Sequence, residues 1–182
     1  ASWPRRVEMA GVGSPIFSLV ESKRNCLLIS LMAWRVDMLN WAARYFPIVR
    51  LLKPHLSETD SLLEIGSGSI GIGMFYHAPF VGCEINFLSV PNPPMLPVVA
   101  SATSLPFEDR SFDGVVLSDV LEHVPPDQRM IVIREALRVA RKVIIFGFPS
   151  GSKAFEYDVK LAEVYDRSRQ DRPVWLQEHL RY

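Results

Sequence analysis

Residues 62–71 read Leu-Leu-Glu-Ile-Gly-Ser-Gly-Ser-Ile-Gly, an apolar run that contains one acidic residue and ends in a glycine-rich turn. Such a run predicts a buried parallel strand that leads through a tight loop into the start of a helix. Gly66 and Gly68 permit a sharp turn and let a ligand approach the backbone, and free amides at a helix start favour polar or anionic groups. Glu64 lies at the carboxyl end of the strand, where open α/β sheets bind ligands. The stretch therefore predicts a nucleotide-binding loop.

A second apolar run, Phe80–Glu84, ends in an acidic residue eighteen positions after Gly66. This spacing suits a carboxylate that accepts hydrogen bonds from both hydroxyls of a ribose. The alternative for Glu84 is a solvated charge at the end of a strand.

Three further motifs follow in the chain. Ser-Ala-Thr-Ser-Leu-Pro-Phe occupies 101–107, Phe-Asp occupies 112–113 and Leu-Glu-His occupies 121–123. Together with the glycine-rich stretch, this series closely resembles the class I S-adenosylmethionine-dependent methyltransferases, in particular those of the small-molecule type. The resemblance covers residues 62–149, nearly half of the chain, with the motifs in the order and spacing of that family.

The resemblance implies a methyltransferase that uses S-adenosylmethionine, releases S-adenosylhomocysteine and acts on a small-molecule methyl acceptor. By the same resemblance, Glu64 and Gly66 would line the methionine end of the cofactor, and Glu84 would hold the ribose. Ala102 would offer its amide to the adenine, and Asp119 would lie near the amino-acid group or the methyl. The full implied cofactor-binding set is Glu64, Gly66, Ser67, Gly68, Glu84, Ser101, Ala102, Thr103 and Asp119.

Ser101 departs from the family pattern. It stands where the family commonly carries an acid that contacts the adenine amino group, and a serine hydroxyl carries no charge. The departure predicts a cofactor site that is usable but weaker.

His123 is the candidate catalytic residue, because it is the histidine that the motif series places in the predicted cleft. Methyl transfer from a sulfonium is an in-line displacement that needs a base only when the acceptor must lose a proton. An imidazole titrates near neutral pH and could accept that proton. The alternative is a histidine that packs or caps the loop before Pro125. Two roles are open for Phe107, a cover for the purine or a core residue. Asp113 is expected to form a structural hydrogen bond to a turn.

The chain has 182 residues with 20 basic and 20 acidic side chains, which predicts one globular domain. Zero net charge and the lack of a basic run argue against a nucleic-acid partner. The arginines at 134, 138 and 141 are expected on a solvated helix face. Residues 25–34 are the most apolar stretch near the start, but ten residues are too few for a membrane span. Two cysteines in unlike contexts indicate no metal site and suit a reducing, cytoplasmic compartment.

The expected fold is α/β, a Rossmann-like three-layer sandwich with a mainly parallel sheet. We expect an N-terminal helical extension over 1–57, an S-adenosylmethionine-binding core over 58–150 and a C-terminal helical segment over 151–182. Strands are predicted at 61–65, 80–84, 98–101, 114–118 and 143–148. The four prolines within 89–97 predict an irregular loop there.

The family's final antiparallel hairpin has no counterpart between Gly151 and Tyr182, where no strand pair with a turn occurs. The strand over 143–148 would then expose an open edge. Three outcomes are open: residues 154–182 pack across the edge, a second copy pairs with it in a homodimer, or the chain is a fragment of a protein that continues.

Two other functions are compatible with parts of the sequence. The first is an NAD-dependent oxidoreductase, since Gly66, Gly68 and Gly71 together with Glu84 satisfy the dinucleotide fingerprint. Glu64 argues against it, because that position normally continues the apolar strand in dinucleotide binders. The second is a non-catalytic cofactor-binding or scaffold protein, which Ser101 and the missing hairpin would allow.

Overall fold

The structure is a computed structural model that describes residues 38–39, 41–91 and 93–181. Residues 1–41 and 42–182 form two separate units, and the fold described below is that of the second unit. Much of the predicted N-terminal extension, together with Cys26, lies outside the described residues. Residues 42–52 are helical, as expected for the end of that extension.

The centre of the unit is a five-stranded sheet in the order β3-β2-β1-β4-β5, in which every neighbouring pair is parallel. This order confirms the predicted Rossmann-like α/β fold. The bounds of the strands in chain order are β1 Leu62–Ile65, β2 Phe80–Glu84, β3 Met95–Val99, β4 Phe112–Ser118 and β5 Ala140–Gly147.

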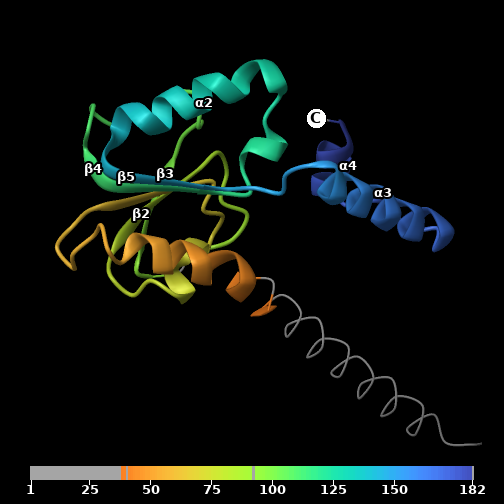
Figure 1. The fold of residues 1–182 in the computed structure, drawn as a ribbon, viewed down its shortest axis with the longest axis horizontal. Helices are drawn as coiled ribbons and strands as arrows, with labels where there is room; N and C mark the ends of the chain where they lie inside the picture. The colour runs from red at the N-terminus through yellow and green to blue at the C-terminus, as the bar shows by residue number, and fades with distance from the viewer. Residues whose placement is uncertain (1–37, 40, 92, 182) are drawn as a thin grey trace, which may run out of the picture. The chain divides into compact units, whose positions relative to one another are not determined.

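Helices cover both faces of the sheet (Figure 1). Helix α2 (Pro126–Val139) lies on one face, where Val132 and Ala136 are buried in the main core with β1 and β4 residues. The helical segment 42–52 lies on the other face and buries Ile48 and Leu52. Every residue of β1 and β4 is buried, which is the near-continuous apolar pattern of a strand covered on both faces.

Strand β3 begins at Met95, so the prediction of an irregular loop up to residue 97 is wrong at its end. Pro97 lies within the strand and pairs in register with Gly82. Since β3 is the outermost strand on its side, one of its edges forms no backbone hydrogen bonds to another strand of the described sheet. Proline is tolerated at such an edge because its missing N–H breaks no ladder bond.

The predicted helix after the glycine loop is replaced by a single 3-10 turn, η1 (Gly71–Met74). Glycine is a poor helix former, and this turn contains two glycines. Gly71 has a φ of +55°, and a side chain at this position would collide with the carboxylate of Glu64. The position therefore requires glycine, which weakens the helix that the sequence pattern predicts.

The arginines predicted on a solvated helix face are partly structural. Arg138 donates hydrogen bonds to the carbonyl oxygens of Phe107 (2.7 Å) and Leu105 (3.1 Å), and Arg141 lies in β5 and binds Asp113 at 2.7 Å. The Arg141 guanidinium holds the pKa of Asp113 well below its usual range. Asp113 also accepts a bond from the Ser61 amide, as expected of a structural residue.

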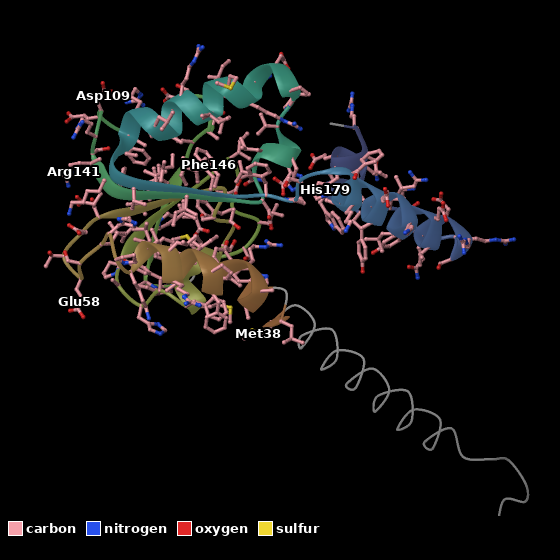
Figure 2. All side chains as sticks on the ribbon, in the orientation of Figure 1. Met38, Glu58, Asp109, Arg141, Phe146 and His179 are labelled. Atoms are coloured by element: carbon pink, nitrogen blue, oxygen red, sulfur yellow. The ribbon has the colours of Figure 1, made fainter. Side chains whose placement is uncertain are left out.

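Helices α3 (Ser152–Arg167) and α4 (Val174–Arg181) pack on each other, and α4 also contacts η2 (Leu121–His123). Among the described residues, no strand pairs with β5 on its outer side. Arg141 in β5 lies at one end of the sheet, and His179 in α4 lies beyond the other end, near the start of α3 (Figure 2). No helix in the described part of the chain is long and apolar enough to cross a membrane.

Candidate functional site

A cavity of about 450 Å³ opens at the carboxyl ends of β1, β2 and β4. This is the place where parallel α/β sheets bind ligands, and the volume lies in the range of small-molecule sites. It is lined by most of the predicted cofactor residues, namely Gly66, Glu84, Ser101, Ala102, Thr103 and Asp119, and by the candidate base His123. Glu64, Ser67 and Gly68 do not line it.

The glycine loop is fixed to the neighbouring strand. The amides of Gly66 and Ser67 donate to the carbonyl oxygen of Cys83 at 2.8 and 3.3 Å. Gly66 has a φ of +73°, and a Cβ there would collide with the side chain of Val120. Position 66 therefore requires glycine for two reasons, the left-handed backbone conformation and the close packing against Val120.

Glu84 holds the other side of the loop. Its carboxylate accepts hydrogen bonds from the Gly68 amide (3.0 Å) and from the Ile85 amide (2.8 Å). The residue is half-buried and lines the cavity. A carboxylate held by two amides at the end of β2 presents negative oxygen atoms in a fixed place, as recognition of a diol requires.

Glu64 lies beneath the loop and is fully buried. Its carboxyl accepts a hydrogen bond from the Tyr45 hydroxyl (2.8 Å) and one from the Ile72 amide (2.7 Å). Burial raises the pKa of Glu64 to about 7, although both hydrogen bonds oppose the shift. This carboxyl therefore supports the glycine loop from below and does not face the cavity.

The loop after β3 contributes Ser101, Ala102 and Thr103 to the cavity wall. The hydroxyls of Ser101 and Thr103 are hydrogen bonded at 2.8 Å, and the Ser101 oxygen also accepts from the Thr103 amide. Phe107 does not line the cavity and instead packs edge-on against Phe112, with ring centroids 4.9 Å apart. Phe107 is therefore a core residue and does not cover the cavity.

Asp119 follows β4 and adopts a φ of +53°, which is rare outside glycine. Its amide donates to the carbonyl of Gly147 at 2.7 Å, and its carboxylate pairs with Arg44 from the helical segment 42–52. Strained backbone of this kind is concentrated at functional sites. Asp119 thus brings a negative charge to the cavity wall from the end of β4.

His123 is oriented by a residue that the sequence pattern did not indicate. Its Nδ1 lies 2.7 Å from the carboxylate of Glu178 in α4, which also lines the cavity. A second histidine, His179, stands beside it with ring centroids 4.8 Å apart and contacts Asp158 in α3 at 3.1 Å. These partners lie more than 30 positions after His123, so only the fold brings them together.

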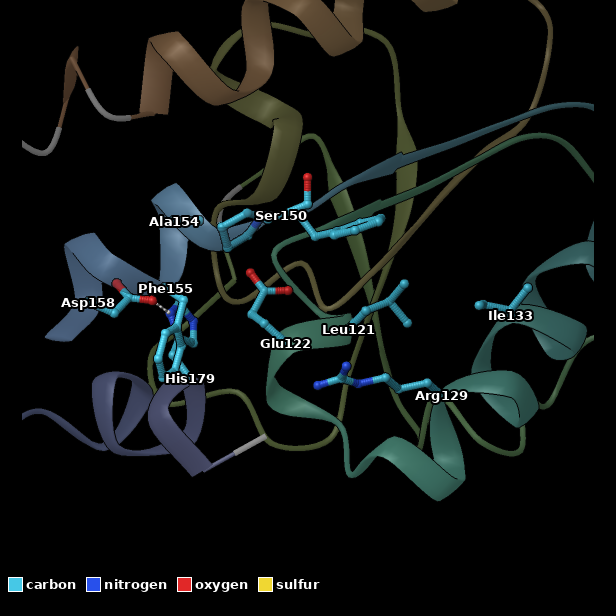
Figure 3. Close-up of a pocket in the computed structure, with 12 residues that line it drawn as sticks. Leu121, Glu122, Arg129, Ile133, Ser150, Ala154, Phe155, Asp158 and His179 are labelled. Carbon is cyan, nitrogen blue, oxygen red and sulfur yellow. Dashed lines mark hydrogen bonds and ion pairs between the residues drawn. The ribbon is translucent and has the colours of Figure 1, made fainter.

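A second cavity adjoins η2 on the side of α3 and is lined by Glu122, Arg129, Phe155 and His179, among others (Figure 3). Both carboxylate oxygens of Glu122 and the Nε2 of His179 are buried and have no hydrogen-bond partner within the described part of the chain. Burial raises the pKa of Glu122. The two cavities share η2, because Glu122 faces one of them and His123 the other.

The parallel sheet, with a cavity at its carboxyl end, defines an α/β domain of the Rossmann-like class. Residues 63–145 match the model of the family described as "Methyltransferase domain". This match covers just under half of the chain and is consistent with the class I S-adenosylmethionine-dependent methyltransferases.

Solved structures show the same fold. A protein from Pyrococcus horikoshii OT3 is 22% identical, with a TM-score of 0.50, over 68% of this chain and 62% of that one. A putative methyltransferase from an antibiotic biosynthesis pathway of Anabaena variabilis is 20% identical, with a TM-score of 0.50, over 75% of this chain and 55% of that one.

A structure described as a SAM-dependent methyltransferase from Methanosarcina mazei is 27% identical, with a TM-score of 0.42, and the match covers 50% of this chain. The chain spans about half of that protein, 52% of its length. A comparison with proteins of curated function found no match.

Proposed function

We propose that this chain binds S-adenosylmethionine in the cavity at the carboxyl ends of β1, β2 and β4 and transfers its methyl group to a small-molecule acceptor. The observation that supports this most directly is the joint presence of Gly66, Glu84, Ala102 and Asp119 on the wall of one cavity. These residues come from four separate segments of the chain. The family resemblance implies a contact with the cofactor for each of them.

The residues present fit such a cofactor. Glu84 offers carboxylate oxygens for the two ribose hydroxyls, and Gly66 leaves the end of β1 free of a side chain. Asp119, whose carboxylate also pairs with Arg44, offers an acceptor for the ammonium of the methionine part. Ser101 provides a neutral hydroxyl for the adenine, so we expect binding without the charged contact that many relatives make.

The cofactor supplies a methyl group on a positively charged sulfur, which is a good leaving group. The protein then has to hold the acceptor in line with that methyl and keep water away. In this proposal a hydroxyl acceptor enters on the side of His123, and Nε2 of this histidine removes the proton. Glu178 accepts from Nδ1–H, which fixes the ring and the tautomer that leaves Nε2 free as a base.

Calorimetric titration with S-adenosylhomocysteine and NAD tests the proposed binding. We expect S-adenosylhomocysteine to bind and NAD to give no heat. Glu84→Ala should weaken binding by about 10- to 100-fold, the effect of losing hydrogen bonds to a charged group. Binding of NAD without any response to S-adenosylhomocysteine would support the oxidoreductase instead.

Two further variants serve as controls for Glu84→Ala. Glu84→Gln keeps an acceptor for the Gly68 amide, so it separates loss of the ribose contact from a rearranged loop. Glu58→Ala removes an exposed carboxylate elsewhere and should leave the affinity unchanged. If Glu84→Ala binds as tightly as the unchanged chain, Glu84 serves only to hold the glycine loop and the proposed ribose contact is wrong.

A further inference from the structure

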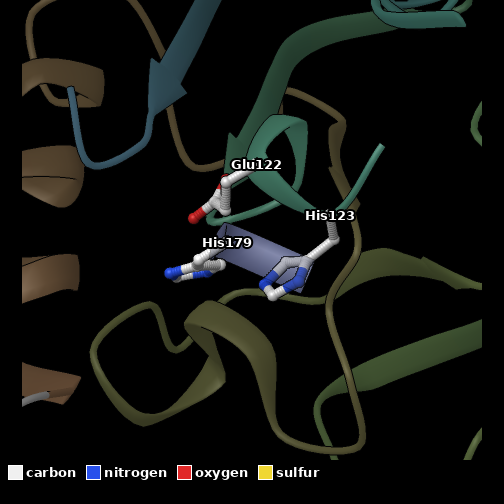
Figure 4. Close-up of side chains that lie close together, drawn as sticks. All are labelled: Glu122, His123 and His179. Carbon is white, nitrogen blue, oxygen red and sulfur yellow. The ribbon is translucent and has the colours of Figure 1, made fainter. Parts of the chain in front are cut away.

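Three side chains at the border of the two cavities could hold a metal ion together. Glu122 and His123 come from η2 and His179 comes from α4, and one ligand atom from each lies within 4.8 Å of the other two (Figure 4). In a tetrahedral zinc site the bonds are about 2.1 Å, so ligand atoms lie roughly 3.4 Å apart. Side-chain rotations that shorten these separations would bring the three groups around one ion.

Both histidines already have the hydrogen bonds that metal-bound histidines usually make. Nδ1 of His123 contacts Glu178 at 2.7 Å, and Nδ1 of His179 contacts Asp158 at 3.1 Å. A carboxylate accepts the Nδ1 proton, so each neutral ring keeps its lone pair on Nε2. A carboxylate behind the ring also raises the basicity of the ligand and fixes its direction.

Three of the remaining polar atoms of the cluster lack partners among the described residues. These are both oxygens of Glu122 and the Nε2 of His179, which are buried and receive no hydrogen bond from any described residue. Unpaired buried polar atoms are costly and are rare in folded proteins. A cation placed between these atoms would pair with all of them.

From these observations we infer that Glu122, His123 and His179 form a binding site for a divalent transition-metal ion, with zinc as the best fit. Two imidazoles and one carboxylate are a ligand set that zinc accepts, and imidazole nitrogen disfavours magnesium and calcium. The three ligands do not form a short sequence motif, because His179 lies 56 positions after His123. Glu178 and Asp158 act as positioning residues for the two rings.

Three protein ligands leave a fourth tetrahedral position open. His123 also lines the proposed cofactor cavity, so the open position would lie at its border. A hydroxyl of the acceptor bound there would lose its proton more easily, and His123 would then be a ligand and not the base. Only this consequence rests on the proposed function; the binding of the ion does not.

Zinc binding to the full 182-residue chain, measured by equilibrium dialysis with elemental analysis, tests the site. We expect one ion per chain, and binding of Co²⁺ in its place with the visible absorption of a tetrahedral complex. Glu122→Gln and His179→Ala should each weaken zinc binding by more than about 100-fold. Asp158→Asn should weaken it by about 10- to 100-fold, as loss of a supporting carboxylate does.

The chain offers a matched control in its other two histidines. His55 and His77 are exposed and lie outside the cluster, so the double variant His55→Ala, His77→Ala should bind zinc as the unchanged chain does. If His179→Ala does not fold, Glu122→Gln and Asp158→Asn decide the result. The inference fails if no zinc binds, or if the control loses zinc while these two variants retain it. Binding of S-adenosylhomocysteine in the same samples shows separately whether the proposed function holds.

Discussion

The hydroxyl of Tyr45 donates a 2.8 Å hydrogen bond to Oε1 of the buried Glu64. This bond links the helical segment 42–52 to the central strand β1. The other oxygen of Glu64 accepts from the Ile72 amide at 2.7 Å, in the turn that follows the glycine loop. One buried carboxyl therefore joins the helical layer, the sheet and the loop at the cavity, and its neighbours determine how firmly the loop is held.

Replacing Tyr45 by phenylalanine should destabilise the protein. The ring remains, but Glu64 loses a donor in a place that water does not reach. We expect the free energy of unfolding to fall by about 1–3 kcal/mol, measured by urea denaturation at neutral pH. Tyr157→Phe is the control, because this tyrosine is 72% exposed. Equal stability of both variants would show that the bond to Glu64 contributes nothing.

The raised pKa of Glu64 predicts a pH dependence of stability. Its ordinary value is 4.5 and burial raises it to about 7 in the folded chain, so between these values the folded state holds more protons than the unfolded state. The contribution of Glu64 to stability is therefore complete below the unfolded pKa and is lost as the pH rises through the folded pKa. The loss is on the order of 3 kcal/mol.

Glu64→Gln tests this dependence. Glutamine cannot ionise, yet its oxygen can accept from the Ile72 amide and its amide group can donate to Tyr45. We expect the variant to unfold with a free energy that changes less than that of the unchanged chain between about pH 5 and pH 8. Two parallel pH profiles from urea denaturation would contradict the assignment of the slope to Glu64.

Arg138→Ala should lower the thermal midpoint by several degrees. The guanidinium donates hydrogen bonds to the carbonyl oxygens of Leu105 and Phe107 and also pairs with Glu135. Its loss therefore detaches the loop before β4 from helix α2. Arg134→Ala, an exposed position on the same helix, should leave the midpoint unchanged. Thermal unfolding followed by circular dichroism compares the two. Similar midpoints for both variants would show that Arg138 contributes no more to stability than a residue on a solvated helix face.

Ser101→Asp should keep or strengthen binding of S-adenosylhomocysteine. An aspartate would still accept from the Thr103 amide, as the serine oxygen does, and would add a charged acceptor for the adenine amine. We expect a gain of up to about tenfold in affinity. Ser104→Asp adds the same charge to the same loop at an exposed position that does not line the cavity. Weaker binding to Ser101→Asp than to this control would contradict the predicted adenine position.

The local pattern of apolar residues predicted the sheet well, because buried parallel strands consist of short apolar runs. Strand β2 matches the prediction residue for residue, whereas β3 starts three residues early, at Met95. The error arose because four nearby prolines normally exclude regular structure, and the sequence did not reveal that β3 would be an edge. The short turn at Gly71 was missed for a related reason, since the lack of room for a side chain beside Glu64 arises only in the folded chain.

The candidate site was predictable where its residues follow strands. Glu84, Ala102 and Asp119 follow β2, β3 and β4 and line one cavity, and their contacts with a cofactor stay a prediction. Glu64 has the right position in sequence but points beneath the loop. The partners of His123 were not predictable, because Glu178 and His179 lie on a helix whose docking depends on tertiary packing.

Pro97 has a consequence for how the protein behaves at high concentration. A strand from another molecule that tried to extend the sheet beyond β3 would find no amide hydrogen at this residue. The exposed apolar side chains of Leu96 and Val99 flank it and would otherwise favour such templated growth. Pro97 therefore acts as a gatekeeper against aggregation at one border of the sheet.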